Sequence, residues 1–414
     1  MPQENAHEQG RRLYDEAKFQ EAARMLACAI GEQESSEAWN DWATAQLHCG
    51  NPAEAEQGYT RALELNEKNG QALVNLGILL VNIDRLEEAI GLLEIGIPSM
   101  DTPEQEPLKQ LVAECRRKQA ERGEPALQTL ANYLGDFVAE EEQSLQYFKN
   151  QLSRYLVTLE LLPSAVPGER LLEVGASNHH QTPALKRWKG YDVRCTDLWD
   201  GPQQWNQTVA NRNGDESHIF PVDNFDVEQV PWPYPDASFD VVMLCELLEH
   251  LSTDPMRVMG EINRVLKQGG KLLLSTPNVA SARSVEAALR GESPYFWGQY
   301  EVGGLPTDHH NREYTPGEVV RLTQAAGFGI LTLRTAGGIG APNRSVLRDM
   351  VRSGHSIAWR GDCILVLAQK EGPVRDRYPA EFYSRTGTQE ACRRQRAGRP
   401  AECEASPVLS PASA

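Results

Sequence analysis

The sequence predicts a two-part protein, in which an all-α region precedes an open α/β sheet with helices on both faces. Over about residues 8–100, small and apolar residues recur every 33 or 34 positions, a period typical of stacked helical pairs. Further along, the run 170–177 (RLLEVGAS) ends an apolar stretch at Gly175, and a second short run ends 22 positions after that glycine in Asp197. A strand, a helix and a second strand ending in an acid form the nucleotide-binding half of a doubly wound sheet.

The repeat is carried by matched positions 34 residues apart. They are Trp39, Trp42, Ala43, Ala55, Tyr59 and Ala62, which recur as Leu73, Leu76, Gly77, Ala89, Leu93 and Gly96. A lone unit cannot bury its apolar face, so about three stacked units are expected. The period, with small residues where paired helices touch, resembles the tetratricopeptide repeat. That resemblance implies a groove for a protein partner, and the alternative is a helical spacer or dimerisation arm without a ligand of its own.

The remaining segments complete the predicted organisation. Residues 1–100 are assigned to the repeats, 101–140 to a linker or helical connector, and 141–372 to the α/β domain. Within that domain, the glycine-containing stretch 279–316 is longer than ordinary loops and is predicted to be a substrate lid. Residues 385–414 are predicted to be a disordered tail. Seven strands are expected, at about 170–175, 191–196, 217–222, 239–245, 271–276, 328–335 and 362–369.

The loop after the first expected strand narrows the choice of ligand. From Gly175 it reads GASNHH, whereas the dinucleotide fingerprint needs three spaced glycines. A single glycine makes a poor cradle for a pyrophosphate. This favours a ligand that carries ribose and adenine without phosphates, and it points to S-adenosylmethionine.

Three further runs support that interpretation, namely 230–251 (VPWPYPDASFDVVMLCELLEHL), 261–270 (EINRVLKQGG) and 271–278 (KLLLSTPN). Together with the first loop and Asp197, they resemble the class I S-adenosylmethionine-dependent methyltransferases over roughly residues 140–372. The resemblance implies a Rossmann-like, seven-stranded methyltransferase sheet whose last strand runs antiparallel. It also implies S-adenosylmethionine as the cofactor.

Residues around the first two strands are candidate cofactor contacts. Gly175 lets the methionine part of the cofactor lie against the loop, and Glu173 is expected to reach its ammonium group through a water or through the loop. The Asp197 carboxylate is expected to accept hydrogen bonds from the two ribose hydroxyls. Ser177 lies in the same loop, at a position where relatives carry more glycine, and is included among the cofactor contacts.

The other wall of the cleft is expected to come from residues further along the chain. The resemblance places an acid near the adenine amino group, and Asp226 is favoured over Asp223 for that position. Cys245 and Glu246 follow the expected strand 239–245 and are included because the end of that strand borders the cleft.

Two groups of residues are candidates for the chemistry. Glu246, Glu249 and His250 are predicted to share one helix face, and the lid supplies His309 and His310. In the favoured interpretation, His250 and one lid histidine act as base or orient the acceptor, because a hydroxyl must lose its proton when it is methylated. In the alternative, Glu246, Glu249, His250 and His309 (or His310) hold a divalent cation that polarises the hydroxyl. The Glu-x-x-Glu-His pattern resembles the metal-binding helix of small-RNA 2′-O-methyltransferases and of some ubiquinone-pathway O-methyltransferases.

The acceptor is predicted from the weakest pattern. The lid and the run 378–383 (YPAEFY) are similar to bacterial methyltransferases that act on sugars of surface polysaccharides, which makes a sugar hydroxyl the first choice. A quinone, a polyketide or another small hydroxylated metabolite is the second choice, and a protein presented by the repeats is the third. The remaining alternative is a non-catalytic scaffold with a vestigial methyltransferase fold, which the intact Glu173, Gly175 and Asp197 argue against.

Composition excludes several classes of partner. A net charge of -17 argues against nucleic acid and anionic membranes. No apolar run approaches the roughly 18–20 residues that a membrane span needs. The first residues lack the layout of a signal peptide, and the eight cysteines are scattered, so reduced thiols and a cytoplasmic location are expected.

Overall fold

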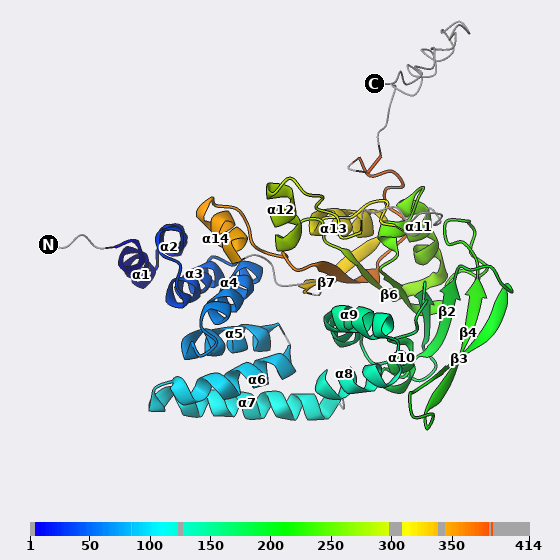
Figure 1. Ribbon diagram of the computed structural model, residues 1–414, viewed down its shortest axis with the longest axis horizontal. Helices are drawn as coiled ribbons and strands as arrows, with labels where there is room; N and C mark the ends of the chain where they lie inside the picture. The colour runs from blue at the N-terminus through cyan, green and yellow to red at the C-terminus, as the bar shows by residue number, and fades with distance from the viewer. Residues whose placement is uncertain are drawn as a thin grey trace, which may run out of the picture.

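The computed structural model describes residues 5–83, 85–122, 127–297, 309–337, 344–380 and 382–383. Repeated helices stack along one side of the molecule, and a twisted sheet covered by further helices forms the other side (Figure 1). The predicted tail and the middle of the predicted lid lie outside the described residues. Within the described ranges, no helix has both the length and the apolar character that a membrane crossing requires.

Six helices form three antiparallel pairs at the N-terminal side. Their bounds are α1 (Ala6–Asp15), α2 (Phe19–Glu32), α3 (Ser36–His48), α4 (Pro52–Leu65), α5 (Gly70–Asn82) and α6 (Leu86–Gly96). The small residues of the repeat lie where the paired helices touch. A Cβ atom on Gly10 would lie 2.6 Å from Cγ of Leu26, and one on Gly77 would lie 2.7 Å from Cγ of Leu93. The prediction of an all-α region built from stacked helical pairs is confirmed, whereas its assignment to the tetratricopeptide family stays a prediction.

The connector is more helical than a linker. The short 3₁₀ turn η1 (Ile97–Ser99) leads to α7 (Thr102–Arg122), α8 (Leu127–Asp136) and α9 (Glu142–Leu161). Helix α9 packs on the sheet through Tyr155 and Leu159, both buried. It therefore leads the chain into the α/β domain, as the helical pattern before Pro163 indicates.

The sheet has eight strands in the order β3-β4-β2-β1-β5-β6-β8-β7. Neighbours from β4 to β6 pair in parallel, whereas β8 is antiparallel to both β6 and β7, as the resemblance implies for the last strand. The strands are β1 (Arg170–Val174), β2 (Asp192–Asp197), β3 (Gln204–Ala210), β4 (Ser217–Asn224), β5 (Phe239–Cys245), β6 (Leu266–Pro277), β7 (Phe328–Ala336) and β8 (Cys363–Lys370). The Rossmann-like sheet is confirmed with one strand more than predicted. The additional strand, β3, is a polar edge strand that forms a hairpin with β4.

Helices cover both faces of the sheet, so the central strands are buried on both sides. On one face, Leu172 and Val174 of β1 pack against α11 (Pro255–Val265) and α13 (Pro316–Ala325). On the other face, Leu171 packs against α8, α9 and α10 (Thr182–Arg187). Continuous apolar runs such as 241–244 (VVML) are the expected pattern for parallel strands that are covered on both sides.

The α/β domain also reaches back to the repeats. Between β7 and β8 the chain forms α14 (Arg344–Arg352), which packs on α2, and α12 (Ala282–Leu289) lies beside it. The buried residues of α14 share one hydrophobic core with the repeat helices; they are Val346, Leu347, Met350 and Val351. Beyond α14, the backbone N–H of Ile357 donates to Oε2 of Glu54 at 3.1 Å. The α/β domain and the repeats are therefore joined by packing as well as by the connector.

Candidate cofactor and acceptor site

The first loop of the site is shaped by Gly175, which follows β1. Its φ of +74° lies in the left-handed region, and a Cβ atom there would overlap the side chain of Leu247. Its N–H donates to Oγ1 of Thr196 at 3.1 Å, which ties the loop to the end of β2. Ser177 is exposed in the same loop, also with a positive φ. The sequence therefore placed the sharp turn at the correct residue.

The buried side chain of Glu173 fixes the position of this loop. The residue is buried, and its carboxylate accepts hydrogen bonds from Nε2 of Gln181 at 3.0 Å and from Oγ1 of Thr182 at 2.7 Å. Burial raises the pKa of Glu173 to about 7, against the lowering effect of these hydrogen bonds. The carboxylate thus acts on the loop through Gln181 and Thr182, two residues that the sequence analysis did not single out.

A second residue missed by the sequence is Arg154 on α9. It is buried, donates from Nε to Oε1 of Gln151 at 2.9 Å, and lies 3.9 Å from Oε1 of Glu246. Although burial favours the neutral guanidine, the carboxylate of Glu246 raises the pKa of Arg154. A fixed positive charge therefore stands between β1 and the end of β5. The sequence gives no signal of this burial, because Gln151 and Thr158, one helical turn away on either side, are polar.

Asp197 ends β2, as predicted, and is half-buried beside the first loop. Its Oδ1 accepts a hydrogen bond from the N–H of Leu198 at 2.8 Å. The carboxyl ends of β1 and β2 meet at the same edge of the sheet, where doubly wound sheets bind their ligands. Asp197 and Gly175 therefore lie at the same edge of the sheet.

The two acids considered for the adenine side have different surroundings. Asp223 is buried and bonded to Arg194, to the hydroxyl of Tyr234 and to Nε2 of Gln204. Both carboxylate oxygens of Asp223 therefore already accept hydrogen bonds within the protein. Asp226 is half-buried and accepts a hydrogen bond from the N–H of Glu228 at 2.9 Å, which leaves it the better candidate.

The predicted helix face that carries Glu246, Glu249 and His250 is wrong. Glu246 has a φ of +50°, and the residues after it form a 3₁₀ turn, η2 (Leu248–His250), instead of an α-helix. The chain turns sharply because it leaves β5 at this point. Glu246 consequently points to Ser275, whose hydroxyl donates to its Oε1 at 2.7 Å. Beside it, burial raises the pKa of the Cys245 thiol to about 12, so this thiol stays protonated at neutral pH.

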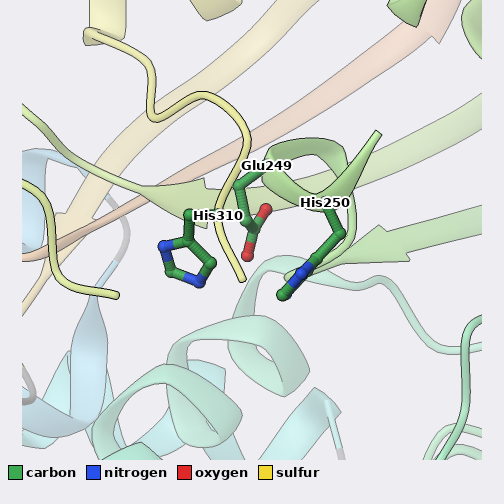
Figure 2. A group of neighbouring side chains, drawn as sticks. All are labelled: Glu249, His250 and His310. Carbon is green, nitrogen blue, oxygen red and sulfur yellow. The ribbon is translucent and has the colours of Figure 1, made fainter. Parts of the chain in front are cut away.

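The turn instead brings Glu249 and His250 together with His310 (Figure 2). One ligand-type atom from each of the three lies within 4.8 Å of the others. The rings of His250 and His310 meet edge to face, with centroids 4.9 Å apart. Segment 309–314 is held there by Asn311, whose N–H donates to the Glu249 carbonyl and whose side-chain amide donates to the His250 carbonyl, each at 2.8 Å. We call Glu249, His250 and His310 the acceptor cluster.

Each member of the acceptor cluster is constrained. Glu249 is fully buried, and its Oε2 accepts from Oγ1 of Thr276 at 2.9 Å, while its Oε1 has no hydrogen-bond partner within the described part of the chain. Burial, and secondly the charge of Glu246, raises the pKa of Glu249 well above its ordinary value. His309 contributes its backbone, because its carbonyl oxygen lies 3.2 Å from Nδ1 of His250. Neither Glu246 nor the ring of His309 belongs to the group of ligand atoms, which departs from the predicted metal set.

The known proteins that resemble this chain include several methyltransferases. A family model described as a methyltransferase domain matches residues 172–274. The chain is 35% identical over 111 residues to a glycine/sarcosine/dimethylglycine N-methyltransferase of Actinopolyspora halophila, covering 27% of this chain and 19% of that protein. It is 35% identical over 111 residues to a 27-O-demethylrifamycin SV methyltransferase of Amycolatopsis mediterranei, covering 26% and 38%. It is 37% identical over 94 residues to a ubiquinone biosynthesis O-methyltransferase of Idiomarina loihiensis, covering 22% and 35%.

The chain spans less than two fifths of the length of each of these relatives. The matched residues 172–274 nevertheless run from β1 into β6, and they include the first loop, Asp197, Asp226 and the turn after β5. Residues 172–274 of this chain thus match a methyltransferase domain, and the α/β part is similar to S-adenosylmethionine-dependent methyltransferases.

Proposed function

We propose that this protein transfers a methyl group from S-adenosylmethionine to a hydroxyl group of a small acceptor, with a sugar as the first choice. One observation carries the proposal. The acceptor cluster lies directly after β5, at the same sheet edge as Gly175 after β1 and Asp197 at the end of β2. The candidate cofactor contacts and the groups that can accept or donate a proton therefore lie at one edge of the sheet.

Cofactor binding is assigned to the residues around the first loop. Gly175 and Ser177 form the loop, Asp197 accepts hydrogen bonds from the ribose hydroxyls, and Asp226 faces the adenine side. Glu173 keeps the loop in place through Gln181 and Thr182. Arg154 supplies a buried positive charge next to Glu246, which suits the carboxylate of the methionine part.

The transfer itself is an in-line displacement. The acceptor oxygen forms a bond to the methyl carbon, the bond between that carbon and sulfur breaks, and S-adenosylhomocysteine leaves as a neutral thioether. Alignment supplies most of the acceleration. The proton of the acceptor hydroxyl passes to an imidazole of the acceptor cluster, for which His310 is the first candidate, and His250 orients the hydroxyl.

A divalent cation is the alternative way to activate the hydroxyl. The acceptor cluster offers one carboxylate and two imidazoles, and Oε1 of Glu249 has no protein partner within the described residues. This donor set fits a transition-metal ion better than Mg²⁺, which prefers oxygen ligands. Such an ion would lower the pKa of the acceptor hydroxyl. Burial raises the pKa of Glu249 in the cation-free cluster, so binding of such an ion would release a proton from this carboxyl group.

The repeats are assigned to a protein partner. Helices α2 and α4 contact the α/β domain through α14 and through the Ile357–Glu54 hydrogen bond. Helices α1, α3 and α5, the first of each pair, contact one another along the row. We therefore assign the partner to the face formed by α1, α3 and α5.

The test is calorimetric titration with S-adenosylmethionine and S-adenosylhomocysteine, followed by a screen of hydroxylated acceptors that detects S-adenosylhomocysteine release. The screen contains sugars, catechols and amines as separate arms, each with and without a chelator. Cofactor binding with turnover on a hydroxyl acceptor supports the proposal. Turnover that survives chelation selects the histidine base, and turnover lost and restored by Mn²⁺ or Zn²⁺ selects the cation. Absence of cofactor binding would replace the enzyme by the scaffold alternative.

A further inference from the structure

A cavity of ≈ 600 Å³ separates the repeats from the α/β domain, at a distance along the chain from the cofactor loops. One wall comes from α4 and α6 of the repeats, another from the end of α9, and a third from β7. The volume lies in the range of natural ligand sites, which is roughly 300–1,000 Å³. None of the residues assigned to the cofactor or the acceptor lines it.

The contribution of β7 identifies the kind of ligand. Residues 331–335, five in succession, line the cavity. Successive side chains of a strand point to opposite faces of the sheet, so a cavity that borders all five must lie against the hydrogen-bonding edge of the strand. β7 is the last strand of the sheet and pairs only with β8 on its inner side. No backbone hydrogen bond from the described residues reaches its outer edge at 331–335.

This edge has a bulge and one charged residue, Arg334, but its last five residues form a regular stretch without proline or lysine. Edge strands are commonly interrupted by proline or lysine, but β7 (FGILTLRTA) contains neither. Its one irregularity is a bulge between Ile330 and Thr332, which leaves Thr332–Ala336 as a regular stretch. Five residues span about 16 Å, enough for an added strand to form several main-chain hydrogen bonds.

The charges of the cavity wall largely neutralise one another. Arg334 donates to Oε2 of Glu160 at 2.7 Å and lies 3.6 Å from Glu88, and Arg85 pairs with Glu88 and Glu56. The carboxylate of Glu87 accepts hydrogen bonds from the N–H of Leu127 at 2.8 Å. The lining holds four carboxylates and three cationic side chains, a formal charge of -1, so it offers little net attraction to a charged ligand.

Apolar side chains from three separate elements do face the cavity. Ile83, Leu331 and Trp359 line it, and they are 44%, 50% and 42% exposed. Large apolar groups this exposed, gathered around one hollow, mark a binding surface. Together with a free strand edge, they suit alternate apolar side chains of an extended chain.

We propose that this cavity binds an extended, uncharged segment of a separate polypeptide, which adds to β7 as a ninth strand and packs its apolar side chains between the repeats and the sheet. The site does not depend on the proposed methyl transfer. It differs from the face of α1, α3 and α5, because α4 and α6 form its wall.

The test uses a fluorescent eight-residue peptide of alternating valine and threonine, acetylated and amidated, in fluorescence anisotropy with the full chain. Saturable binding is expected, together with slowed hydrogen exchange at residues 332–336. Two versions methylated on alternate backbone nitrogens provide the control for strand addition. The version blocked on the pairing edge should lose at least tenfold in affinity, and the version blocked on the other edge should bind like the parent. Equal binding of both versions, or no saturable binding of the parent peptide, would overturn the proposal.

Matched variants locate the binding. Leu331→Lys, at an exposed residue of the cavity, should weaken peptide binding at least tenfold, whereas Leu289→Lys, an exposed leucine of α12 outside the cavity, should leave it unchanged. Unchanged S-adenosylhomocysteine affinity shows that both variants fold, and equal peptide affinity in both would refute the location. A chain ending at Tyr383 should bind the peptide as the full chain does. Tighter binding by the shortened chain would instead assign the cavity to the protein's own C-terminal segment.

Discussion

Nδ1 of His310 lies 2.6 Å from Oε1 of Glu313, and both side chains are buried. Oε1 of Glu313 accepts the Nδ1–H of His310 in the tautomer that this contact favours. The lone pair of Nε2 then lies on the side of Glu249 and His250 (Figure 2). Oε1 of Glu313 is itself fixed by the N–H of Phe296 at 2.6 Å. A carboxylate behind a histidine sets its tautomer and its orientation. The pair explains why this histidine, among adjacent ones, is the one suited to accept a proton.

We expect His310→Ala to lower turnover by at least about 100-fold, the usual effect of removing a general base. His309→Ala should retain most of the activity, because His309 contributes a backbone carbonyl to His250. S-Adenosylhomocysteine release measured on both variants gives the comparison. Equal losses in the two would remove His310 from the chemistry.

Glu313→Gln should reduce kcat by about 10- to 100-fold, since the amide can present a donor to Nδ1 and favour the wrong tautomer. KM for the acceptor and affinity for S-adenosylhomocysteine should change little. The pH–rate profile distinguishes this role from a structural one. The limb of the profile that reports on the His310 base should move when the tautomer of that histidine changes. A variant whose profile matches the wild type, with kcat intact, would show that Glu313 only supports the fold.

Asp197→Ala should weaken S-adenosylhomocysteine binding by about 1–3 kcal/mol, or roughly 5- to 150-fold, because two ribose hydroxyls lose their acceptor. Asp200→Ala is the matched control, an exposed acid three positions later. Calorimetric titration measures the affinity of both variants for S-adenosylhomocysteine. An unchanged dissociation constant for Asp197→Ala would move the ribose to another residue.

Glu173 should make stability depend on pH. Its pKa is higher in the folded chain, about 7, than the ordinary 4.5, so the folded state holds this proton more tightly. The resulting stabilisation is complete below about pH 4.5 and is lost as the pH rises through 7. Glu173→Gln, which imitates the protonated form, should therefore gain stability relative to the wild type between pH 5 and pH 8, by up to roughly 3 kcal/mol.

Urea unfolding at both pH values measures this difference, with the exposed Glu142→Gln as control. A difference between Glu173→Gln and the wild type that does not grow with pH would mean that Glu173 is ionised in the folded protein.

Leu347→Ala should destabilise the chain by about 2–5 kcal/mol, because it opens a cavity in the core shared by α14 and the repeats. Arg348→Ala, at the neighbouring half-exposed position, should cost little. Chemical unfolding is followed by tryptophan fluorescence, in which the buried Trp39 and Trp42 supply the signal of the repeats and the tryptophans after residue 180 supply the signal of the sheet domain. A loss confined to the sheet signal would show that α14 does not stabilise the repeats.

Sequence patterns predicted those parts of the molecule where one local cause dominates. Gly175 could be placed because only a glycine tolerates its φ and its contact with Leu247. The buried strands follow from apolar runs. Strand β3 could not be predicted, because its polar residues alternate between partial and full exposure at the edge of the sheet and form no apolar run.

The acceptor cluster was predicted in composition but not in geometry. The spacing of Glu246, Glu249 and His250 fits an α-helix as well as it fits a strand end followed by a 3₁₀ turn, and the positive φ of Glu246 decides between them. The choice between His309 and His310 depends on Glu313 and on how Asn311 docks, and both are tertiary contacts. Arg154 was missed because a buried arginine in a helix resembles an ordinary exposed one in sequence.

The helix α14 has a consequence for how this protein can be divided. A chain shortened to begin at residue 141 would retain α14 but lose α2, against which it packs. One face of α14 would then expose a contiguous apolar surface to water, and such a surface promotes self-association. Its residues are Val346, Leu347, Met350 and Val351. The repeats therefore shield an apolar surface of the α/β domain from water, so cutting the chain between the two parts would expose it.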